Sequence, residues 1–140
     1  MVSPCKRKLS RLLSLLGVAA LSSLARGQAP AFTLEQAELG KAVYSAHCQL
    51  CHGNNLSNGQ FGTPLRGSYF RKKWGGKSVG ELLQFTLESM PPDNKGGLPA
   101  EQYAATLAYI LSRNDIAPGS TALPADPAAL QSVPLPWPAP

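Results

Sequence analysis

One stretch of the sequence combines residue types and a spacing that suit a specific reaction, Cys48-Gln49-Leu50-Cys51-His52. Two thiols separated by two residues can each form a thioether with one vinyl group of a haem. The adjoining His52 is then placed to bind the haem iron through an imidazole nitrogen. The motif therefore predicts covalent attachment of one haem c, with iron bound by His52.

Two other uses of paired cysteines lack some of their parts in this chain. A thioredoxin-type dithiol accompanies a βαβ pattern, and no convincing run with the period of a strand is present. A structural zinc site needs a second ligand pair at a distance. Here His47, Cys48, Cys51 and His52 are bunched together, and no Cys or His follows them. Haem attachment is the interpretation for which every part is available.

At this motif the chain resembles the class I c-type cytochromes, over about residues 33–114. Besides Cys48 to Gly53, the resemblance rests on Met90-Pro91-Pro92 and on the run Leu107-Ala108-Tyr109-Ile110. It implies an all-α small cytochrome c fold, with three to four helices around one covalently bound haem. It also implies an electron-transfer protein that is not an enzyme, with redox proteins as electron donor and acceptor.

The sixth iron ligand decides whether a haem protein carries electrons or binds small molecules. His47 directly precedes Cys48 and cannot reach the far face of the ring. The only methionines are Met1, at the start of the leader, and Met90, at an expected helix end. We therefore expect His52 and Met90 as axial ligands, a pair that raises the reduction potential. The alternative for Met90 is a core-filling side chain, the usual use of methionine.

The resemblance implies roles for four more residues. Pro64 resembles the family's proline, whose carbonyl accepts a hydrogen bond from the ligating histidine. Leu65 would then lie against the porphyrin. Trp74 resembles the tryptophan that donates its indole N–H to a haem propionate, and Arg66 is expected to pair with the same group. The structural alternatives are a turn proline, a core aromatic side chain and a surface arginine.

Capping and periodicity indicate the helices that must position these residues. Thr33 is expected to cap a first helix that runs into the haem motif, and Pro99 to open a last helix ending near residues 113–114. In class I cytochromes the first and last helices cross at small and aromatic residues. Gly40 and Tyr44 match that arrangement, with Tyr109 as the expected partner.

Between these two helices the sequence predicts a loop, two helices and a turn. Residues 53–67 are rich in turn formers, and residues 68–74 suit a short helix. Residues 78–81 form a capping box that opens a helix. That helix must end at Met90, because two prolines follow it and cannot continue a helix.

The chain divides into three parts by composition. Residues 1–27 combine a basic start with an apolar run too short to span a membrane comfortably, which predicts a signal peptide and a periplasmic protein. An uncleaved leader is the alternative, and only then is membrane contact expected. Residues 28–116 form the cytochrome domain. Residues 117–140 hold seven of the 13 prolines, so we expect an extended or disordered tail, either inert or a docking peptide.

The basic pI does not describe the folded domain. The chain has 13 basic and 8 acidic residues, and five of the basic ones lie within residues 1–27. The remainder is neutral and carries no nucleic-acid-binding motif, so no nucleic acid is expected as a partner. Its one local cluster of positive charge is either a solvated face or a patch that steers an acidic partner. The cluster consists of Arg71, Lys72, Lys73 and Lys77.

Three functional interpretations follow from these features. The first is a periplasmic single-electron carrier. The second is a subunit of a dehydrogenase complex, because residues 90–98 resemble cytochromes that accept electrons from quinoprotein dehydrogenases; a terminal oxidase is then the expected acceptor. The third is a haem enzyme or gas sensor with a labile Met90, although the sequence offers no distal histidine.

Overall fold

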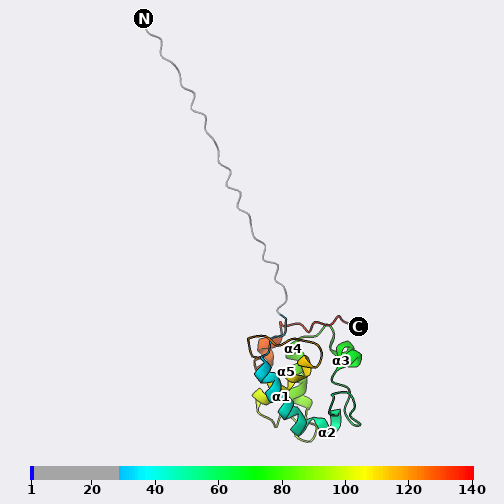
Figure 1. Ribbon diagram of the computed structural model, residues 1–140. Coiled ribbons are helices and arrows are strands. Elements are labelled where there is room, and N and C mark those ends of the chain that lie inside the picture. Colours follow the sequence, from blue (N-terminus) through cyan, green and yellow to red (C-terminus); the bar gives the residue numbers. More distant parts are fainter. Residues whose placement is uncertain (2–28) are drawn as a thin grey trace.

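The computed structural model describes Met1 and residues 29–140, and the predicted signal peptide otherwise lies outside these residues. The described chain is all-helical (Figure 1), which confirms the fold class. The described residues form five α-helices, where three to four were expected, because the haem motif forms a short helix of its own. A 3-10 helix follows the five. The elements are α1 (Leu34–His47), α2 (Gln49–His52), α3 (Gly67–Trp74), α4 (Val79–Ser89), α5 (Ala100–Ser112) and η1 (Pro127–Leu130).

Helices α1 and α5 form the largest contact between elements of the described chain. Thr33 caps α1 as predicted, because its Oγ1 accepts a hydrogen bond of 3.1 Å from the Gln36 N–H. The predicted close approach at Gly40 is confirmed: a Cβ atom there would lie 1.8 Å from the Ala105 carbonyl oxygen. Tyr44 and Tyr109 meet beside this crossing, as expected, with ring centroids 5.4 Å apart.

Helix α4 begins and ends where its sequence signals predict. The Ser78 side chain accepts from the Glu81 N–H, and the Glu81 carboxylate accepts from the Ser78 N–H. This second hydrogen bond lowers the pKa of Glu81 below its ordinary value. At the other end, the Met90 N–H donates to the Thr86 carbonyl at 2.9 Å. The Tyr103 hydroxyl of α5 donates to the Met90 carbonyl at 2.6 Å, so two helices hold Met90 in place.

Residues 117–140 pack against the helices, so the predictions of a disordered tail and of a separate segment beginning at residue 117 are wrong. Leu123, Leu130 and Leu135 are each at most 4% exposed and belong to the hydrophobic core. Helix η1 packs against α4. The chain then runs on to end close to α3, as Figure 1 shows. We call residues 117–140 the C-terminal strap.

The end of the strap is fixed to the turn between α3 and α4. Three backbone hydrogen bonds of 2.8 to 3.0 Å join them: Leu135 N–H to Lys77 O, Val79 N–H to Val133 O, and Gly76 N–H to Trp137 O. The Trp137 ring packs edge-on against Phe70 of α3, with centroids 5.7 Å apart. Trp137 therefore anchors the strap inside the domain. No described helix is both long and apolar enough to cross a bilayer.

Leu135→Ala should lower the free energy of unfolding by about 2–5 kcal/mol, because it empties a buried site in the strap. Denaturant titration of the haem-loaded protein measures this loss. Ser132→Ala is the matched control, since Ser132 is exposed in the same segment, and its effect should stay within about 0.5 kcal/mol. Equal stability of the two variants would contradict the packing of the strap.

Candidate cofactor site

The helices and two loops line a cavity of about 580 Å³ that is partly open to solvent. Its volume falls within the ~300–1,000 Å³ that is typical of small-molecule and cofactor sites. Most of the wall is apolar, and its side chains come from elements far apart in the sequence, among them Leu65, Phe70, Trp74, Leu82 and Ile110. Such a wall suits a large apolar group and excludes water from it.

The short helix α2 brings the three motif side chains to this cavity. The His52 N–H donates to the Cys48 carbonyl at 3.0 Å, which closes the turn and brings Cys48 and Cys51 onto one side of it. All three residues line the cavity. Both thiols are half-buried and form no disulfide. Burial, and secondarily the neighbouring Cys51, raise the pKa of the Cys48 thiol to about 11, so it stays protonated at neutral pH.

A backbone carbonyl fixes the orientation of the His52 ring, but it is not the predicted one. His52 Nδ1 lies 2.8 Å from the carbonyl oxygen of Thr63, whereas the resemblance implied Pro64. A carbonyl only accepts, so Nδ1 carries the proton and Nε2 keeps its lone pair for a ligand. The next carbonyl along the chain, that of Pro64, is not the acceptor. The sequence placed the acceptor one residue too far along.

Two backbone hydrogen bonds account for this register. The Gly62 N–H donates to Cys51 O at 2.9 Å, and the Leu65 N–H donates to Leu56 O at 2.7 Å. The loop between these points turns the Thr63 carbonyl toward the histidine. Gly62 is essential to this approach, because a Cβ atom there would lie 2.5 Å from His52 Nδ1. Sequence reasoning treated Gly62 only as a turn former.

Of the other predicted site residues, the structure brings all but one to the cavity. Met90 lines it from the end of α4, and Pro64, Leu65 and Trp74 line it as well. Trp74 is 6% exposed. Its ring packs against Phe85 of α4, which also lines the cavity. Arg66 is the N-cap residue of α3 and does not line the cavity.

Some lining residues had no sequence signal. Thr106 of α5 is only 3% exposed, and its Oγ1 has no hydrogen-bond partner among the described residues. Phe61 and Phe85 line the cavity and are exposed. Buried hydroxyl groups normally have a hydrogen-bond partner, so an unpaired one at a cavity wall indicates that a polar group of a ligand could serve as its partner. Taken with the apolar wall, the paired thiols and the imidazole, this donor set fits a haem.

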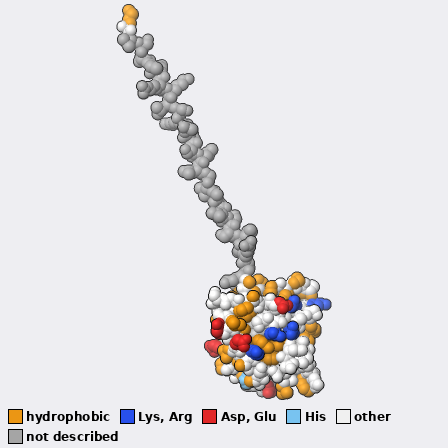
Figure 2. All heavy atoms as spheres, viewed as in Figure 1, with side chains coloured by type: hydrophobic (Ala, Val, Ile, Leu, Met, Phe, Trp, Pro, Cys, Tyr) orange, Lys and Arg blue, Asp and Glu red, His pale blue; other side chains and the backbone are white. Residues whose placement is uncertain are grey.

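The predicted basic cluster is not one uniform patch. Two of its members form ion pairs, Arg71 with Asp115 and Lys77 with Glu81 at 3.6 Å. Lys73 lines the cavity, and its Nζ lies 5.8 Å and 5.2 Å from the ring centroids of Trp74 and Phe85. Basic, acidic and apolar side chains intermingle on the face in Figure 2. Lys72 and Lys73 are the members of this cluster that form no ion pair within the described part of the chain.

Comparison with known proteins gives one match. A family model described as cytochrome C oxidase, cbb3-type, subunit III, matches residues 35–110, just over half of the 140-residue chain. The matched region contains the haem motif and Met90 and ends before the C-terminal strap. No curated protein and no solved structure matches the chain.

Proposed function

The chain belongs to the c-type cytochrome family of cbb3-oxidase subunit III, and we propose that it works as an exported single-electron carrier. Membership of this family gives the protein a covalently bound haem c, with iron, and redox proteins as partners. It also makes the protein an electron-transfer protein rather than an enzyme. One observation carries the proposal: a single apolar cavity whose wall includes the haem motif and a methionine.

In the proposed site, Cys48 and Cys51 hold the haem through two thioethers. Addition of each thiol S–H across one haem vinyl group would account for the two C–S bonds, with the hydrogen placed on carbon and no net oxidation. The one-turn helix α2 supports this arrangement, because Cys48, its N-cap residue, and Cys51, within it, both line the cavity. Covalent attachment keeps the group in place through every electron transfer.

His52 and Met90, which both line the cavity, are the residues that would bind the haem iron in this proposal. The Thr63 carbonyl holds the His52 ring and leaves Nε2 free to bind iron. Hydrogen bonds from Met90 N–H and to Met90 O hold the methionine at the cavity wall. The haem supplies a one-electron redox couple, whose potential a His/Met pair raises. The apolar wall keeps water away from the haem, and this lowers the reorganisation energy of each electron transfer.

The location and the partners also belong to this proposal. The basic start and apolar run of residues 1–27 support export to the periplasm. The likeness of residues 90–98 to cytochromes served by quinoprotein dehydrogenases favours a second candidate function, a subunit of a dehydrogenase complex. In either role we propose a dehydrogenase as the electron donor and a terminal oxidase as the acceptor.

Covalent attachment predicts that denaturing the exported protein leaves haem on the chain, with a thioether-type pyridine haemochrome spectrum. Replacing both Cys48 and Cys51 with serine should let acid acetone extract all the haem, because no thioether remains. Gln49→Ala, between the two cysteines, is the matched control and should keep the haem bound. Free extraction of haem from the unaltered protein would exclude the proposed attachment.

Met90→Ala should abolish the near-infrared sulfur-to-iron charge-transfer band of the ferric protein and lower its reduction potential. The thioether is a soft ligand that favours ferrous iron, so its loss favours the ferric state. The variant should also bind carbon monoxide rapidly. Ser89→Ala, one residue earlier and outside the cavity wall, should retain both band and potential. Absence of the band in the unaltered protein would refute Met90 ligation.

Electron transfer with an acidic redox partner should slow as salt is added, because exposed charges are screened beyond about 8 Å at physiological ionic strength. Lys73→Glu should slow it several-fold further, since Lys73 lies at the cavity wall. Lys41→Glu makes the same charge change on α1, outside that wall, and should have little effect. A rate that responds to neither salt nor Lys73→Glu would identify the cluster as a solvated face.

A further inference from the structure

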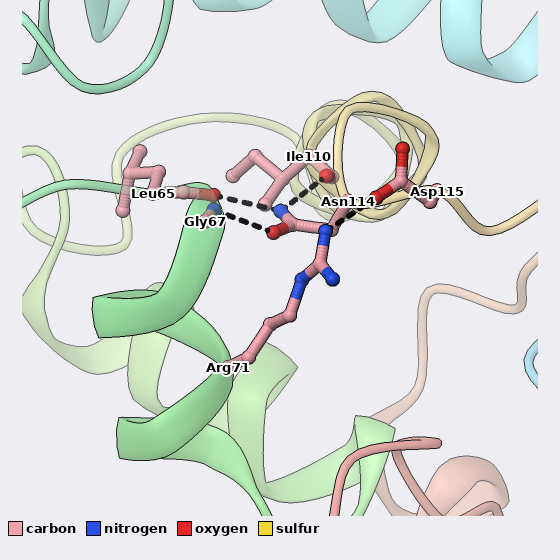
Figure 3. A network of polar contacts seen from close by, with 6 residues as sticks. All are labelled: Leu65, Gly67, Arg71, Ile110, Asn114 and Asp115. Carbon is pink, nitrogen blue, oxygen red and sulfur yellow. Dashed lines mark hydrogen bonds and ion pairs between the residues drawn. The ribbon is translucent and has the colours of Figure 1, made fainter.

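Asn114, just after α5, is the least exposed of the buried polar residues, at 2%. Its side-chain amide makes three hydrogen bonds (Figure 3). Nδ2 donates to the carbonyls of Leu65 and Ile110, each at 2.9 Å, and Oδ1 accepts from the Gly67 N–H at 3.1 Å. Both amide hydrogens and the amide oxygen are therefore used, as expected for a fully buried asparagine.

Two of these hydrogen bonds join segments that are far apart in the sequence. Ile110 belongs to the same helix end as Asn114, whereas Leu65 and Gly67 lie where the loop enters α3. The N-cap residue of α3, Arg66, makes no side-chain capping bond. Asn114 thus satisfies a free N–H at the start of α3 in place of a local cap.

The segment held by Asn114 is the one that orients His52. Thr63, whose carbonyl bonds His52 Nδ1, lies two residues before Leu65, whose carbonyl bonds Asn114. Pro64 separates them, and its ring fixes its own backbone φ angle. This restriction leaves fewer free rotations between the two carbonyls, so we expect a displacement of the Leu65 carbonyl to shift the Thr63 carbonyl as well. Apart from His52 itself, Asn114 is the one described side chain that hydrogen-bonds to residues 63–65, which the backbone bond from Leu65 to Leu56 also holds.

We propose that Asn114 is a positioning residue for the haem ligand His52, acting through the Thr63–Leu65 segment. The inference rests on the proposed function, in which His52 binds the haem iron. A carbonyl that accepts from the far ring nitrogen makes the imidazole a stronger donor to iron. By holding that carbonyl at 2.8 Å, Asn114 stabilises ferric iron and sets the reduction potential lower than a loosened loop would.

The test compares Asn114→Ala with the unaltered haem-loaded protein. Loss of the amide leaves the Leu65 carbonyl without its partner, while the Leu65 N–H stays bonded to Leu56 O. We expect the loop to loosen and the hydrogen bond from His52 to Thr63 to lengthen. The midpoint potential should therefore rise. The hyperfine-shifted resonances of the His52 ring should move, and its Nδ1–H should exchange faster with solvent. Thermal stability should also fall, because two carbonyls and one N–H lose their buried partner.

Asp115→Asn is the matched control. Asp115 pairs with Arg71 of α3 next to the Asn114 network (Figure 3), so it also joins α3 to the end of α5. Asparagine tolerates the positive φ of 67° at this position. The substitution removes the ion pair without touching residues 63–65, and we expect the potential and the His52 resonances to stay unchanged.

A purely structural role for Asn114 would give a different result. Asn114→Ala would then lose stability while its potential, His52 resonances and exchange rate matched those of Asp115→Asn, and the inference would be overturned. If Asn114→Ala fails to accumulate, Asn114→Ser decides by the same readouts, because its hydroxyl is too short to reach Leu65. Absence of hyperfine-shifted His52 resonances from the unaltered protein would instead refute His52 ligation.

Discussion

Helices α1 and α5 approach so closely at Gly40 that a side chain there would collide with the Ala105 carbonyl. The rest of the cofactor site depends on this contact. Helix α1 ends at the haem motif, and α5 contributes Thr106 and Ile110 to the cavity wall. A larger residue at position 40 would separate the two helices and move one wall away from the other. Asn114 follows the C-terminal end of α5 and bonds to the Leu65 carbonyl. The crossing therefore also supports the loop that contacts His52.

A domain of little more than 100 residues buries a limited core. This one also keeps a cavity of about 580 Å³ for its cofactor, so fewer of its apolar side chains can pack against one another. The C-terminal strap supplies part of what is missing. Helix η1, with Leu130, packs against α4, and the Leu123 backbone bonds to the Gln36 side chain of α1. Trp137 packs against Phe70, which itself lines the cavity. The strap therefore supports the cofactor wall from outside, although it contributes no residue to that wall.

The polar contacts of the core converge on the histidine of the haem motif. The Thr63 carbonyl contacts its ring directly, Gly62 allows the loop to approach, and Asn114 bonds to the same loop at the Leu65 carbonyl. Buried hydrogen bonds of this kind are costly to leave unmade, so they specify one arrangement rather than several. Charge contributes less, because the chain after residue 27 is neutral and two of its four clustered basic residues already form ion pairs.

The sequence by itself determined the features that depend on neighbouring residues. Two thiols and a histidine within one turn define the attachment chemistry, and the capping box at residues 78–81 and the prolines after Met90 set the bounds of α4. Only the tertiary structure decided which carbonyl faces His52 and where residues 117–140 lie. The first depends on the backbone hydrogen bonds from Gly62 to Cys51 and from Leu65 to Leu56, whose register the order of residue types does not specify. The second depends on three leucines too widely spaced to form a continuous helical or strand pattern, so their burial is decided by the surface they meet.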